Sequence, residues 1–151
     1  MKIRDDIITI MDQIKKYHDV PSYTTFEDHL RPSLSMLDES VEKCFPSILL
    51  DEDGPSLNSV FIITNNYLLE VHMNEERLAF DFLKLKSISN YRFDFWDESI
   101  SGANQSIISF QMATITLMHT ENFSSSIYYA GSNRSEWVNS VLEAIPMTLL
   151  L

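Results

Sequence analysis

The sequence predicts an α+β domain, in which two N-terminal helices precede a bent seven-stranded antiparallel sandwich or barrel that is capped by a C-terminal helix. Three observations lead to this prediction. Apolar residues recur at helical spacing up to residue 45, alternate with a period of two from there to residue 131, and return to helical spacing over 132–145. With 151 residues, the chain is long enough for one domain that buries a core without disulfides or metals.

The first 45 residues predict a helical extension. Residues 2–18 carry apolar side chains on one helical face: Ile3, Ile7, Ile10, Met11, Ile14 and Tyr17. A second helix is predicted to start near Pro32, because the first turn of a helix does not use the missing N–H of proline. Its apolar face runs to Cys44 and Phe45, and Pro46 is expected to end it.

Short segments with a period of two follow, which is typical of strands with one buried face. They are residues 47–50, 59–64, 67–73, 78–82, 91–97, 107–119 and 125–131. Asn65-Asn66 tolerates the left-handed backbone of a tight hairpin. Within 107–119 the apolar positions change from even to odd numbers, which predicts a β-bulge or a sharp bend near Met112–Ala113.

The last predicted element is an amphipathic helix in the stretch "SEWVNSVLEAI". Its apolar stripe consists of Trp137, Val138, Val141, Leu142 and Ile145. Such a helix is not stable alone in water, so it must cover an apolar surface. We expect it to close the open end of the strands, with the indole of Trp137 filling the gap.

Seven short strands followed by one helix that carries Trp137 resemble the pleckstrin-homology-like superfold. The resemblance implies a bent sandwich closed by this helix over residues 46–146. Residues 1–45 are then the N-terminal helical extension, and residues 147–151 form an apolar tail. The extension and the tail are two candidate elements for a homodimer.

The charge balance favours a protein partner. Lys and Arg total 11 against 22 Asp and Glu, which gives a formal net charge of −11. Nucleic acids and anionic membranes attract positive charge, so neither is expected as a partner, whereas a basic protein is. An acidic surface that only keeps the protein in solution is the competing interpretation. Cys44 is the single cysteine, which fits the reducing cytoplasm.

Signals of catalysis and of cofactors are weak. The four histidines (His18, His29, His72 and His119) have no i, i+4 pair and no cysteine partner, so no metal and no cofactor is predicted. The resemblance also implies that lipid-binding members hold inositol phosphates with basic residues between the first two strands. Here that loop carries Asp51, Glu52 and Asp53. We therefore expect neither an enzyme nor a phosphoinositide-binding domain.

The candidate binding surface lies on the polar face of strand 91–97. Arg92, Asp94 and Trp96 share this face, and we expect Asp81 and Glu70 on neighbouring strands to lie near it. Trp and Arg are favoured at the centres of protein interfaces. The competing expectation is that an N-terminal helix covers Trp96.

The sequence thus favours a non-enzymatic, cytoplasmic protein-binding module, such as an inhibitor or immunity-type protein for a basic partner. One alternative is an acidic dimer that resembles secretion chaperones and holds an extended peptide. Another is a lipid-binding domain of the pleckstrin-homology or GRAM kind.

Overall fold

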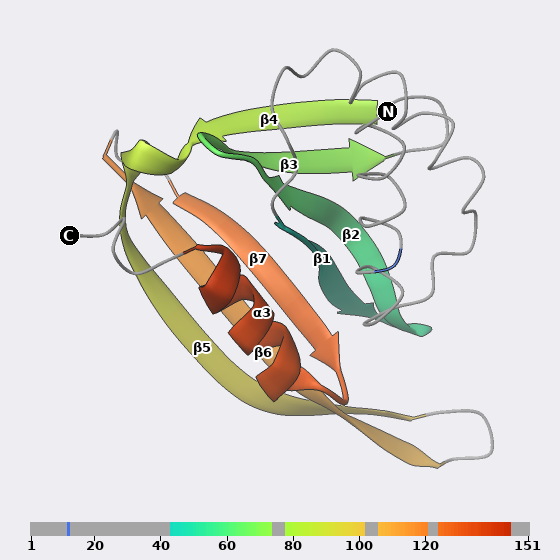
Figure 1. The fold of residues 1–151 in the computed structure, drawn as a ribbon. Helices are drawn as coiled ribbons and strands as arrows, with labels where there is room; N and C mark the ends of the chain where they lie inside the picture. Colours follow the sequence, from blue (N-terminus) through green and yellow to red (C-terminus); the bar gives the residue numbers. More distant parts are fainter. Residues whose placement is uncertain (1–11, 13–42, 74–77, 102–105, 121–123, 146–151) are drawn as a thin grey trace.

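The computed structural model describes Asp12 and residues 43–73, 78–101, 106–120 and 124–145. Within the described residues from Lys43 to Ile145, two antiparallel sheets precede one α-helix (Figure 1). The first sheet contains β1 (Lys43–Asp51), β2 (Gly54–Ile63), β3 (Tyr67–Met73) and β4 (Leu78–Lys84). The short 3-10 helix η1 (Leu85–Ser87) leads to β5 (Ile88–Ser101), β6 (Ile107–His119) and β7 (Ser124–Gly131), and α3 (Arg134–Ala144) follows. No helix in the described ranges is long and apolar enough to cross a membrane.

The predicted α+β class with two N-terminal helices is wrong for the described residues, because residues 43–145 are mostly strand and α3 is their one α-helix. Cys44 and Phe45 do not end a helix but belong to β1. The ring of Phe45 stacks on Phe61 of β2, with 5.6 Å between the ring centroids. Pro46 is accepted here because β1 lies at the edge of its sheet, where a missing N–H costs no ladder bond. The remainder of the predicted extension, apart from Asp12, and the tail 147–151 lie outside the described residues.

Six of the seven segments predicted as strands lie within one observed strand, and the segment 59–64 extends one residue beyond the end of β2 at Ile63. The predicted bulge at Met112–Ala113 is absent, because β5 and β6 stay in continuous register from Asn90↔Met118 to Ser101↔Ile107. The pairing of β6 with β7 extends only to Gln111. Beyond it, β5 and β6 curve away together as two paired strands (Figure 1), so the strands bend there without a bulge. Residues 107–111 of β6 are exposed or half-buried.

β1 joins the two sheets. It pairs with β2 in the first sheet, and the backbone N–H of Tyr128 in β7 donates to Ser47 Oγ at 3.0 Å. Ser47 is completely buried. Its hydroxyl therefore satisfies a backbone donor of the second sheet that no ladder partner reaches.

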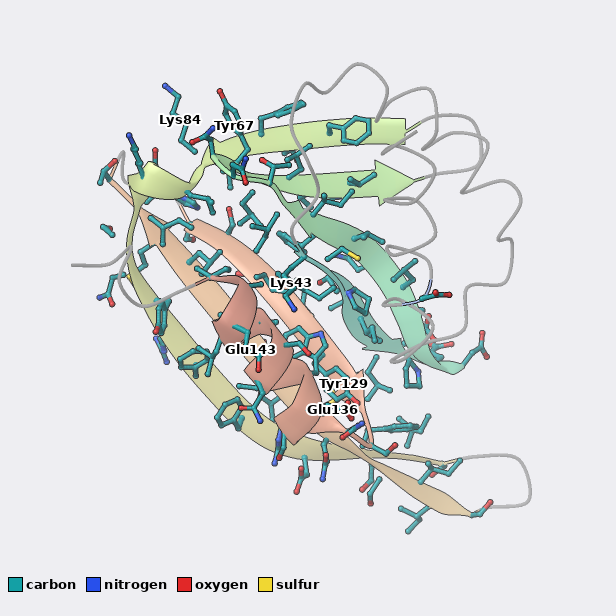
Figure 2. All side chains as sticks on the ribbon, viewed as in Figure 1. Lys43, Tyr67, Lys84, Tyr129, Glu136 and Glu143 are labelled. Atoms are coloured by element: carbon teal, nitrogen blue, oxygen red, sulfur yellow. The ribbon has the colours of Figure 1, made fainter. Side chains whose placement is uncertain are left out.

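The core lies between the sheets and is closed by α3. Trp137 is fully buried, as predicted, and its Nε1–H donates to the carbonyl oxygen of Pro46 at 3.0 Å. Its ring lies 5.2 Å from that of Tyr129 in β7, whose hydroxyl accepts a hydrogen bond from Asn133 N. Figure 2 shows Tyr129 beside the first turn of α3, where Glu136 also lies. The start of α3 is thus held by β1 and β7 together.

We expect Trp137→Phe to lower the free energy of unfolding by about 2–3 kcal/mol, because the change leaves a cavity and a buried carbonyl without its donor. Urea denaturation followed by circular dichroism measures this. Trp96→Phe is the matched control, and its change should stay within about 0.5 kcal/mol since Trp96 is exposed. Equal losses in the two variants would contradict the proposed role of Trp137.

Candidate functional site

Three of the predicted site residues share one face of β5. Arg92 Nη2 lies 3.2 Å from Asp94 Oδ1. Trp96 is 38% exposed, and its Nε1–H donates to Glu98 Oε1 at 3.0 Å. The described residues therefore leave the indole accessible, and the N-terminal segment that was the competing expectation for a cover lies outside them, apart from Asp12.

The other two predicted residues lie in the first sheet. Glu70 of β3 and Asp81 of β4 stand directly opposite each other in the ladder. The chain passes from the first sheet to the second after β4, and β5 pairs with β6 alone. The structure therefore divides the five predicted residues into a β5 group and a β3–β4 group.

Phe95 and Arg134 extend the β5 group and were not found from the sequence. Phe95 lies on the opposite face of β5 from Trp96, and it is 53% exposed although Tyr91 and Phe93 on its own face are half-buried. Arg134 of α3 places its guanidinium 5.5 Å from the centroid of the Phe95 ring. Its Nη1 also donates to the backbone oxygens of Trp96 at 2.9 Å and of Met112 at 3.0 Å. No periodicity in the sequence reports such a contact between residues 38 positions apart.

A small apolar hollow of about 10 Å³, referred to below as the apolar cleft, lies between β5, β6 and α3. Aromatic and aliphatic side chains line it: Tyr91, Phe93, Ile115, Leu117, Val141, Leu142 and Ile145. The hydroxyl of Tyr91 is buried and has no hydrogen-bond partner in the described part of the chain. A buried polar group without a partner is uncommon and costs stability.

A larger cleft of about 690 Å³ opens between the two sheets. Its lining is more polar and comes from β1, β2, β3, β4 and β7: Leu49, Asn58, Glu70, Asp81, Phe82, Leu83, Ser124, Ser125, Ser126 and Tyr128. At its rim, Glu70, His72 and Asp81 bring together three side chains of the kinds that bind metal ions. The sequence pattern placed Glu70 and His72 on one strand face, but only the β3–β4 pairing adds Asp81.

Cys44 and His119 have side chains of the types used in catalysis, and both are buried. Burial raises the pKa of the Cys44 thiol far above its ordinary value, which keeps the sulfur protonated and unreactive. Burial also lowers the pKa of His119, whose Nε2 lies 3.1 Å from Ser125 Oγ. Neither environment is that of an activated nucleophile or a solvent-accessible base.

The turn between β1 and β2 is acidic, as the sequence indicated. Its residues Asp51 to Gly54 include no lysine or arginine, and Asp53 N donates to Asp51 Oδ1 at 2.9 Å. Gly54 has a φ of 112°, a backbone conformation that glycine adopts without strain. The basic residues that inositol-phosphate binding requires at this turn are absent.

No family model and no curated protein matches the chain. Among solved structures, it is similar to the N-terminally truncated linker-DH/PH domains of p115-RhoGEF, with 12% identity and a TM-score of 0.39. The match covers 95% of this chain and 41% of that one, so this chain spans less than half the length of its neighbour. The described part of the chain has four plus three strands and a closing helix with Trp137, in the order that the sequence predicts.

We expect Tyr91→Phe to raise the free energy of unfolding by about 1 kcal/mol, because it removes a buried hydroxyl that lacks a partner. Urea denaturation measures the change. Tyr67→Phe is the control, since Figure 2 shows Tyr67 beside Lys84 at the end of the first sheet, far from α3. A loss of stability in Tyr91→Phe would show that the hydroxyl is already satisfied.

Proposed function

We propose that this chain is a non-enzymatic protein-binding module that holds an extended segment of its partner along β5. The observation that carries the proposal is the combination of a free strand edge with an apolar cleft beside it. Figure 1 shows β5 along the outer edge of the second sheet, with α3 close to it.

The edge of β5 supplies the main-chain part of such an interface. β5 has 14 residues and pairs with β6 on one side, whereas no described strand occupies its other side. An edge strand presents backbone N–H and C=O groups at which another strand can add. A partner segment in extended conformation would therefore gain main-chain hydrogen bonds over several residues.

The side chains around the edge of β5 would determine which partner sequences bind. Trp96 and Phe95 are accessible, and Arg134 holds the backbone beside them in place. Tyr91 and Phe93 form the wall of the cleft, with their ring centroids 5.0 Å apart. Exposed aromatic side chains on a rigid strand are favoured anchors in interfaces. The hollow beside them holds only about 10 Å³, so we expect a partner to contact its rim and the exposed rings of Phe95 and Trp96.

Charge favours a partner segment that also contains lysine or arginine. Arg92 pairs with Asp94 and Arg134 with Asp97, whereas Glu98 has no basic partner in the described part of the chain. The formal net charge of −11 adds a longer-range attraction for basic proteins.

An inhibitor or immunity-type protein for a basic partner would be one such module, and this role stays a prediction. The location in the cytoplasm also stays a prediction. The alternative of a dimer resembling secretion chaperones also stays a prediction, and it shares the extended peptide ligand. The lipid-binding alternative is supported least, because the β1–β2 turn is acidic.

The test is selection of peptides from a random library displayed on phage, with the full chain as bait. We expect peptides with apolar and basic residues, and NMR shift changes in β5 and α3 when they bind. Trp96→Ala should weaken binding by about tenfold or more, as is common for central aromatic residues of an interface.

Phe82→Ala provides the matched control, because Phe82 lies on β4 and is 52% exposed, almost the same fraction as Phe95. We expect it to leave the peptide affinity unchanged, whereas Phe95→Ala reduces it. Selected peptides that move resonances of β4 instead of β5, or that bind Trp96→Ala normally, would refute the proposal.

A further inference from the structure

We propose that Glu70, His72 and Asp81 form a binding site for a divalent transition-metal ion, with Zn²⁺ as its best-fitting occupant. The site lies on the hairpin of β3 and β4, away from β5. It is independent of the proposed peptide binding.

The strand geometry brings the three side chains together. Glu70 and His72 are two residues apart on β3 and therefore point to the same face. Asp81 stands opposite Glu70 on β4, in the register Glu70↔Asp81. Since paired strands lie about 5 Å apart, side chains from these three positions can reach one common point.

The distances between the candidate ligand atoms fit a small metal ion. His72 Nε2 lies 3.2 Å from Asp81 Oδ2 and 3.4 Å from Glu70 Oε1, and all three ligand atoms lie within 4.8 Å of one another. Zinc bonds of about 2.0–2.2 Å in a tetrahedron separate neighbouring ligand atoms by about 3.3–3.5 Å. Small side-chain adjustments therefore suffice to place an ion between the three.

Two further contacts support the site. Ser59 Oγ donates to Glu70 Oε2 at 2.7 Å, which fixes the carboxylate and leaves its Oε1 directed at His72. Outer hydrogen bonds of this kind orient metal ligands. No lysine or arginine in the described ranges pairs with Glu70 or Asp81, so the two carboxylates carry negative charge that a divalent cation would neutralise.

The donor set selects among cations. One imidazole nitrogen and two carboxylates suit Zn²⁺ and its first-row neighbours, whereas Mg²⁺ and Ca²⁺ prefer oxygen ligands alone. Glu70 and Asp81 also line the 690 Å³ cleft between the sheets. A fourth coordination position facing this cleft would be open to water or to a ligand.

A polar cluster without a metal is the competing explanation, in which a protonated His72 Nε2 hydrogen-bonds Asp81 and lies beside the Glu70 carboxylate. Isothermal titration of the metal-free full chain with ZnCl₂ distinguishes the two. We expect a site that is lost, or weakened at least about tenfold, in each of His72→Asn, Glu70→Gln and Asp81→Asn. Ser59→Ala should weaken it by about tenfold without removing a ligand.

Asp53→Asn is the control, because it removes one exposed carboxylate in the β1–β2 turn and leaves the three ligands intact. Circular dichroism and urea denaturation establish that each variant is folded. Co²⁺ absorption in the visible region, present in the wild type and absent in His72→Asn, would confirm coordination by the imidazole. Zn²⁺ binding that is unchanged in His72→Asn and Asp81→Asn, or absent from the wild type, would overturn the proposal.

Discussion

The fold depends on the contact that the buried indole of Trp137 makes with β1. Its N–H reaches the carbonyl of Pro46, 91 residues earlier, and its ring packs on Tyr129 of β7. One side chain of α3 therefore touches both sheets. Because β1 also accepts the Tyr128 N–H through Ser47, the two sheets and the helix meet at a single strand. Pro46 suits this position: its carbonyl accepts the indole, and its missing N–H costs nothing at a sheet edge.

The same arrangement creates the candidate interface. α3 is held at its start by Trp137, Tyr129 and Arg134, so it lies beside β5 and forms one wall of the apolar cleft. The cleft exists because α3 covers the core without covering the edge of β5. A partner strand could add there without disturbing the core. The metal-ligand cluster sits on the other sheet, on the β3–β4 hairpin, and the two sites could be occupied at the same time.

The local features of the fold were readable from the sequence because they follow from spacing along one element. The alternation of residues 67–73 placed Glu70 and His72 on one face, and the helical spacing after residue 133 predicted a buried Trp137. The second predicted helix failed at Cys44 and Phe45. Their spacing fits a helix as well as a strand. The strand is stabilised by the stacking of Phe45 on Phe61 of the neighbouring strand β2, which lies far away in the sequence. The sequence left a bulge and a bend open near Met112–Ala113. The register excludes the bulge, and the change in the apolar pattern marks where β7 stops pairing and β6 becomes exposed.

The sequence by itself determined the strand segments, the closing helix, its buried tryptophan and the acidic character of the surface. Each of these depends on composition or on residues close together in the chain. The tertiary structure alone decided that Glu70 and Asp81 lie in the other sheet from Trp96, that Arg134 supports the exposed ring of Phe95, and that no described strand pairs with the outer edge of β5. These features depend on which strands pair and where the chain changes sheet. Each strand could pair with several others far away in the sequence, and the apolar pattern within a single strand does not specify which of them it pairs with.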